Sequence, residues 1–155
     1  MKLIVDADAC PRAALEMCRV AAKEYGLELV TVSSFNHNIS GDNHTTVGNA
    51  PDEADLKIAN LACRGDIVVT QDMGLAALAL ARGACAINTM GREYLDEDMP
   101  LMLEQRAAGA RYRRGGGRTP GPRKRKAMDD RSFQSGLAAM LARLKAEKTA
   151  KWRPE

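Results

Sequence analysis

Four aspartates are the side chains with the clearest capacity for chemistry in this sequence. Asp6 and Asp8 directly follow one short apolar run, Asp72 follows another, and Asp55 lies in the first turns of a predicted helix. The carboxyl ends of parallel strands meet at one edge of a sheet, where such folds bind ligands, so we expect these carboxylates to lie together. Asp6, Asp8, Asp55 and Asp72 are therefore the candidate catalytic residues.

A cluster of carboxylates indicates a divalent-metal site. Carboxylates packed together repel one another, and their pKa values rise unless a cation lies among them. Mg²⁺ and Mn²⁺ prefer carboxylate and water oxygens as ligands. One or two such ions can activate water and stabilise the leaving oxygen of a phosphodiester. The sequence therefore predicts Mg²⁺ or Mn²⁺ as the cofactor of this cluster.

Each aspartate also has a structural explanation. Asp72 could cap the helix that follows it, and Asp52 and Asp55 could complement the dipole of their helix. Asp6 is the hardest to explain in this way, because a carboxylate that ends a buried strand needs a partner. Asp66 precedes a strand at the opposite end of the predicted sheet, so we expect a structural role for it.

The elements that must position these aspartates alternate between strand and helix. Short β-branched runs predict strands, and proline and glycine mark the starts and ends of helices. We expect strands at 2–6, 29–32, 67–70 and 85–88, a short strand at 45–47 within a loop at 34–50, and helices at 11–25, 51–64, 75–82, 100–108 and 132–148. This alternation predicts a three-layer α/β domain, in which helices flank a parallel central sheet.

Length and composition are those of one cytoplasmic domain. The 155 residues suffice for a single core, and no stretch resembles a signal peptide or a membrane span. The four cysteines have no C-x-x-C spacing, so we expect free thiols rather than a zinc or redox site. We divide the chain into an α/β domain at 1–110, a basic Gly/Pro-rich loop at 111–131, and a C-terminal helix at 132–155 that docks on the same domain.

Charge is distributed very unevenly along the chain. Residues 1–110 carry 9 Lys and Arg against 16 Asp and Glu, whereas residues 111–155 carry 14 against 4. The segment at 111–126 holds eight basic residues without an acid, which predicts salt-sensitive binding of phosphates, most plausibly those of RNA. The alternative is a solvated loop, or one folded onto the acidic part of its own domain. The nucleic-acid-binding candidates are Arg111, Arg113, Arg114, Arg118, Arg123, Lys124, Arg125 and Lys126.

Four motifs follow one another along nearly the whole chain. They are Val5-Asp-Ala-Asp-Ala-Cys-Pro11, Asp52-x-x-Asp55, Gly65-Asp-Ile-Val-Val-Thr-Gln-Asp72 with Leu75-Ala, and a late Gly-Pro followed by Asp130-Arg131-x-Phe133. Together they resemble the YaiI/YqxD family of bacterial proteins. That family looks like a branch of the PIN-like fold, a parallel-sheet domain found in many metal-dependent ribonucleases. The resemblance implies a PIN-like domain for this chain.

The resemblance also implies roles for individual acids. PIN nucleases carry an acid after the first strand, one in a middle helix and one after a later strand, and Asp6, Asp55 and Asp72 match these positions. They are the implied metal ligands, and Asp8 is an additional candidate that would assist directly or through water. The resulting hypothesis is a Mg²⁺- or Mn²⁺-dependent nuclease that hydrolyses phosphodiester bonds, with RNA as the preferred partner.

Two other functions stay open at this point. A non-catalytic RNA-binding protein could retain the same fold with structural acids. A haloacid-dehalogenase-like phosphatase could use Asp6-x-Asp8 as its nucleophile motif, with Thr70 as the second motif. The phosphatase order fails afterwards, because no lysine or later acidic pair follows in a suitable context. The oligomeric state is not predicted by any feature of the sequence.

Overall fold

The chain folds around one six-stranded sheet. The structure, a computed structural model, describes residues 1–34, 43–121 and 123–152. The strands are β1 (Lys2–Asp6), β2 (Glu28–Ser34), β3 (His44–Val47), β4 (Ile67–Val69), β5 (Cys85–Ile87) and β6 (Glu93–Tyr94). They lie in the order β3-β2-β1-β4-β5-β6, and all neighbouring pairs are parallel except β5 with β6. The predicted α/β fold is confirmed, with one antiparallel edge strand that the sequence did not reveal.

β1 lies in the middle of the sheet because its side chains can be buried on both faces. Leu3, Ile4 and Val5 are fully buried. The register places Leu3 between Leu29 of β2 and Ile67 of β4. A continuous apolar run, without polar alternation, is what a parallel strand covered on both faces requires. Both edges of β1 are therefore occupied by neighbouring strands.

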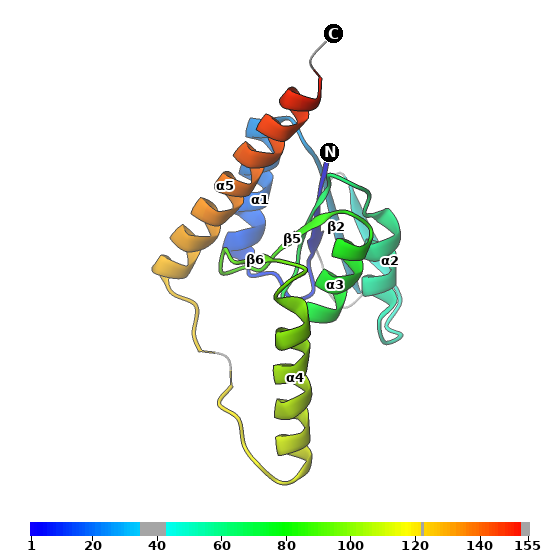
Figure 1. Cartoon of the computed structure of the whole chain (residues 1–155), viewed down its shortest axis with the longest axis vertical. Coiled ribbons are helices and arrows are strands. Elements are labelled where there is room, and N and C mark those ends of the chain that lie inside the picture. The colour runs from blue at the N-terminus through cyan, green and yellow to red at the C-terminus, as the bar shows by residue number, and fades with distance from the viewer. Residues whose placement is uncertain (35–42, 122, 153–155) are drawn as a thin grey trace.

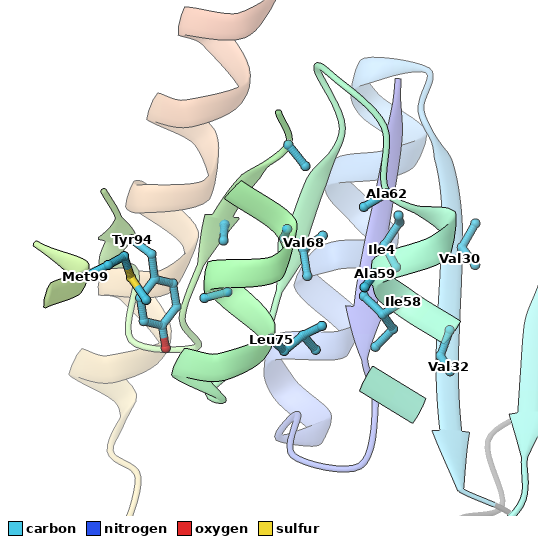
Figure 2. Close-up of a cluster of buried hydrophobic side chains, with 14 residues drawn as sticks. Ile4, Val30, Val32, Ile58, Ala59, Ala62, Val68, Leu75, Tyr94 and Met99 are labelled. Atoms are coloured by element: carbon cyan, nitrogen blue, oxygen red, sulfur yellow. The ribbon is translucent and has the colours of Figure 1, made fainter. Parts of the chain in front are cut away.

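Helices cover the sheet on both faces, in three layers. The five helices are α1 (Arg12–Tyr25), α2 (Glu53–Leu61), α3 (Met73–Ala81), α4 (Met99–Arg114) and α5 (Ala127–Lys151). α1 and α5 pack on one face, and α2 and α3 on the other (Figure 1). On the second face, Ile58 of α2 and Leu75 of α3 join Ile4 and Val68 in one core cluster (Figure 2). The predicted layers are thus present.

α5 docks on the body through the apolar positions that the sequence indicated. Phe133, Leu137, Met140 and Leu141 are buried, and they share a cluster with α1 and the sheet. Leu144, at the next helical position, is half-buried against the same cluster. The spacing of these residues places them on one face of the helix. The C-terminal helix is therefore an integral part of the α/β body.

Two glycines let α5 approach the sheet closely. Gly91, in the turn between β5 and β6, has a φ of 87°, and a Cβ there would lie 2.1 Å from the carbonyl oxygen of Ser132. A Cβ on Gly136 would lie 2.3 Å from the carbonyl oxygen of Gly91. Real Cβ atoms do not come this close to backbone, so both positions require glycine. The backbone of the turn therefore packs directly on the backbone of α5.

α4 projects away from the body, and an extended segment returns the chain to α5 (Figure 1). The sequence predicted helix only to residue 108, whereas α4 continues to Arg114, four residues into the expected loop. Arginine and tyrosine tolerate helix, and the break comes at Gly115, where a run of three glycines begins. α5 begins at Ala127 rather than at 132, and the Asp129 carboxylate satisfies the start of the helix by accepting from the Lys126 backbone N–H at 2.8 Å. The basic loop is therefore shorter than predicted.

Three further predictions concern the chain as a whole. No helix among the described residues is long and apolar enough to cross a membrane. All four cysteines lie within the described residues and are free thiols, as predicted. The predicted loop at 34–50 lies partly outside the described residues, and its expected strand at 45–47 corresponds to β3.

Candidate active site

The topology creates one switch point in the sheet. From β1 the chain moves outward through β2 and β3, and from β4 it moves in the opposite direction through β5 and β6. β1 and β4 are therefore neighbours whose following connections lead to opposite sides. In open α/β sheets, ligands bind in the crevice outside the carboxyl ends of two such strands. Asp6 and Asp8 end β1, while Thr70 and Asp72 follow β4 at the same edge.

Asp6 is the most deeply placed of the candidate acids. Its residue is only 5% exposed, and its Oδ2 accepts a hydrogen bond of 2.9 Å from the hydroxyl of Thr70. Burial raises the pKa of Asp6 to about 6, against the lowering effect of the Thr70 hydrogen bond. The nearby charges of Asp55 and Asp8 raise this pKa further. The pKa of Asp6 therefore lies closer to neutral pH than that of an ordinary carboxyl, which favours either a proton or a cation beside the carboxylate.

Thr70 connects the two strand ends. Besides donating to Asp6, its hydroxyl oxygen accepts a hydrogen bond of 3.0 Å from the backbone N–H of Asp72. Its carbonyl oxygen accepts from the hydroxyl of Tyr94 at 3.3 Å. The sequence had suggested Thr70 only for a phosphatase, and Tyr94 was not singled out. A threonine directly after a buried strand, two residues before an aspartate, was the available signal.

Asp8 turns toward β2. Both of its carboxylate oxygens lie 3.0 Å from the backbone nitrogen of Ser34, and the Ser34 hydroxyl donates to Oδ1 at 3.1 Å. These bonds tie the turn after β1 to the end of β2. Its carboxylate still raises the pKa values of Asp6 and Asp55. Asp8 thus has a structural function and also contributes negative charge to the site.

Asp55 and Asp72 approach the site from two helices. The Asp72 Oδ1 accepts from the Leu75 backbone at 3.1 Å, so the predicted N-cap of α3 is confirmed. Burial raises the pKa of Asp55 most, and the charges of Asp72, Asp52 and Asp8 raise it further. The charge of Asp55 thus acts on Asp6, and the charges of Asp72 and Asp8 act on Asp55. That the four carboxylates form one site stays a prediction.

Asp52 and Asp66 differ from these four. Asp52 stands at the N-cap position of α2 without a side-chain cap bond, and its φ of 63° is the only positive value of a non-glycine residue in the described part of the chain. Asp66 accepts from the backbone N–H groups of Lys2 and Cys63, and it pairs with the Lys2 ammonium at 3.3 Å. Asp66 thus fastens the opposite end of the sheet. The structural role predicted for it agrees with these contacts.

Arg106 of α4 is a member of the site that the sequence did not indicate. Its Nη1 lies 3.8 Å from Oδ1 of Asp72, and its charge lowers the pKa of Asp55. The side chain is 54% exposed. A weak signal was present, because Arg106 lies seven residues after Met99 and therefore on the helix face that is buried at the start of α4. A cation thus stands at the rim of the acidic edge.

The carboxylates of the described residues do not form a closed cage around a metal ion. Among the described residues, no three His, Cys, Asp or Glu side chains lie close enough to hold a metal together. Mg²⁺ is usually held by one or two carboxylates and keeps several waters. The raised pKa values of Asp6 and Asp55 are what such an ion would relieve. That Asp6, Asp55 and Asp72 share one ion stays a prediction.

The basic segment divides into two parts. Arg111, Arg113 and Arg114 form the last turn of α4 and are exposed, as are Arg118, Lys124 and Lys126 on the return to α5. Arg123 and Arg125 instead make ion pairs within the chain. Arg123 makes two hydrogen bonds to Asp129, and Arg125 binds Asp130 at 2.6 Å and the Thr89 carbonyl at 2.7 Å. These two arginines anchor the start of α5, and the other six basic side chains are exposed without such an anchoring role.

Comparison with known proteins gives the family of this chain. Residues 4–143 match a family model described as "Uncharacterized BCR, YaiI/YqxD family". A UPF0178 protein of Heliobacterium modesticaldum is 48% identical over 91% of this chain and 97% of its own length. UPF0178 proteins of Exiguobacterium sibiricum and Listeria monocytogenes are each 41% identical, over 91% and 90% of this chain and 96% and 95% of their own lengths. No solved structure matches the chain. The chain belongs to the YaiI/YqxD family.

Proposed function

We propose that this protein is a divalent-metal-dependent nuclease that hydrolyses RNA at the aspartate edge. The observation that carries the proposal is the buried Asp6, held by Thr70 at the switch point of the sheet and coupled to Asp55 and Asp8. A buried structural aspartate is expected to have a cationic or N–H partner that lowers its pKa, as Asp129 has in Arg123. Asp6 accepts hydrogen bonds from Thr70 and from the Asp8 backbone, yet burial and the charges of Asp55 and Asp8 outweigh them and raise its pKa. Functional sites are where such unfavourable placements recur.

The residues would divide the work as follows. Thr70 fixes the orientation of Asp6 and, through the Asp72 backbone, that of the α3 N-terminus. Asp6 and Asp55 would hold Mg²⁺ or Mn²⁺, with Asp72 or Asp8 contributing directly or through water. A bound ion supplies an activated water and charge stabilisation at the phosphate. The exposed arginines of α4 would attract the backbone of the RNA, whose charge the aspartates would otherwise repel.

The test is cleavage of labelled RNA by the full chain, with Mg²⁺ or Mn²⁺ and with a chelator. Wild type is expected to cleave only with the metal, and Asp6→Asn to lose cleavage. Asp66→Asn is the matched control, since it neutralises a buried aspartate at the other end of the sheet. Cleavage by Asp6→Asn at the wild-type rate, or undiminished cleavage in chelator, would reject the proposal.

A non-catalytic RNA-binding protein is the second candidate. Asp8 and Asp72 both have structural hydrogen bonds, to Ser34 and Leu75, and this observation favours it. It predicts salt-dependent RNA binding that is unchanged by Asp6→Asn and by chelator. Loss of metal-dependent cleavage together with retained binding in Asp6→Asn would decide for the nuclease.

A further inference from the structure

One face of α4 changes its character along the helix. Met99 is buried and Met102 is half-buried against the core of the α2/α3 face. The same face continues through Arg106, Gly109 and Arg113, since these positions recur at alternate spacings of three and four residues. As α4 leaves the body, the face that packs on the core therefore becomes a row of two arginines separated by a glycine.

The first arginine of this row stands at the aspartate edge. The Arg106 guanidinium lies 3.8 Å from the Asp72 carboxylate, and its Nη1 would lie 3.6 Å from a Cβ built on Gly74. Gly74 belongs to the first turn of α3, which Asp72 caps. An ion pair between two exposed groups contributes little to stability, so it leaves Arg106 available for a stronger anion. A phosphate at the aspartate edge would lie within reach of this guanidinium.

The second arginine folds back toward the first. The Nη1 of Arg113 would lie 3.5 Å from a Cβ built on Gly109, so the side chain of Arg113 lies along the preceding turn of the helix. Arg111 of the same turn points roughly 160° away from Arg113, at about 100° per residue. Arg123 and Arg125 are engaged with Asp129 and Asp130. Arg113 is thus the basic group of α4 that points along the row.

We propose that Arg106 and Arg113 bind two phosphates of one RNA strand, so that α4 guides the strand away from the aspartate edge. The inference rests on the proposed function, for which it names the path of the substrate. Seven residues of α-helix correspond to about 10 Å. A stacked strand rises about 3.4 Å per nucleotide, so the two phosphates are about three nucleotides apart. A short RNA reaches only Arg106, and a longer one reaches both arginines.

The test is the binding of fluorescent oligouridylates of increasing length, from two to ten nucleotides, to the full chain. Fluorescence anisotropy is measured with Ca²⁺ in place of Mg²⁺. The assay then reports RNA binding without cleavage, so it also applies if the protein has no nuclease activity. Arg113→Gln should weaken binding of the ten-nucleotide RNA by roughly tenfold and leave the dinucleotide unaffected, while Arg106→Gln should weaken both. For the long RNA, each variant should reduce the slope of log affinity against log salt by about 0.7.

The charge-matched control is Lys148→Gln, which removes an exposed positive charge from the other end of the body, on α5. Arg111→Gln removes a positive charge from the same helical turn as Arg113 but from another face of α4, so it tests whether the effect depends on the face. If Arg113→Gln weakens all lengths equally, or none, the row does not exist. If Arg111→Gln shows the same length dependence as Arg113→Gln, the end of α4 acts only as diffuse positive charge, and the inference is overturned. Either outcome leaves the cleavage assay of the proposed function unaffected.

Discussion

Replacement of Asp6 by asparagine should stabilise the protein. Burial and the charges of Asp55 and Asp8 raise the pKa of Asp6 from 3.8 to about 6, so the folded protein binds this proton more tightly than the unfolded chain. Each pKa unit corresponds to 1.36 kcal/mol, which makes the cost of ionising Asp6 in the fold about 3 kcal/mol. Asparagine keeps an oxygen that can accept from Thr70 and carries no charge, so the variant avoids this cost.

The pH dependence provides a separate check on the predicted direction of the stability change caused by Asp6→Asn. Below pH 3.8 the Asp6 carboxyl is protonated in both states, and wild type and Asp6→Asn should have similar free energies of unfolding. As pH rises from 3.8 through about 6, wild type loses stability relative to the variant. Above pH 7 the full difference of about 3 kcal/mol is expected. Urea unfolding in chelator, from pH 4 to 8, measures it.

A control variant, Asp66→Asn, and the effect of an added metal ion make the prediction specific to Asp6. Asp66→Asn should have the opposite effect and lower stability by about 1–3 kcal/mol, since Asp66 accepts from two backbone N–H groups and pairs with Lys2. Mg²⁺ or Mn²⁺ should stabilise wild type by about 2.7 kcal/mol at a hundredfold excess over Kd, and Asp6→Asn much less. If Asp6→Asn is no more stable than wild type at pH 8 in chelator, the electrostatic reasoning about the site is refuted.

Two glycine substitutions and one at a strained aspartate provide further tests by thermal unfolding. Gly136→Ala should destabilise the fold by several kcal/mol and loosen α5, because its Cβ would lie 2.3 Å from the Gly91 carbonyl; an unchanged Tm would contradict the close packing. A Cβ added by Gly109→Ala in α4 would make only an ordinary contact of 3.5 Å, so this substitution should raise the free energy of unfolding by up to about 1 kcal/mol. Asp52→Gly should stabilise by about 1 kcal/mol, since glycine tolerates the φ of 63° and removes a charge that raises the pKa of Asp55; a loss of stability would show that Asp52 contributes a contact.

The sheet could be predicted because its central strands are buried on both faces. The apolar runs of β1 and β4 are typical of a parallel strand covered on both faces. Gly26 and Gly83 indicated the ends of α1 and α3, whereas α2 ends at Leu61, three residues before its predicted end. β6 has only two residues, so its pattern could not be distinguished from a loop. The ends of α4 and α5 were wrong for another reason. The loop was predicted from the glycines, prolines and unbalanced charge of residues 111–126, but residues 111–114 precede the first of these glycines, and arginine has a high intrinsic preference for helix.

The aspartates at the strand ends could be located from sequence, but the partners that define their roles could not. Thr70 and Ser34 bind Asp6 and Asp8 across 64 and 26 residues of chain, and no local pattern encodes such a pairing. The same holds for Arg123 and Arg125. Their charge was visible in the sequence, whereas their engagement with Asp129 and Asp130 depends on how the chain enters α5.

The arrangement of charge gives a reason for the projection of α4. An acidic edge repels the phosphates that a nuclease must bind. Basic groups placed among the aspartates would instead neutralise the aspartates. A helix that leaves the body at the rim separates the two charges. Arg106 touches the edge, and Arg113 lies about 10 Å further along the helix. Under the proposed function, the RNA strand would be attracted by α4 while the aspartates would remain free to bind a cation. Ionic strength should therefore weaken RNA binding far more than metal binding, and an equal salt dependence of the two would argue against this separation.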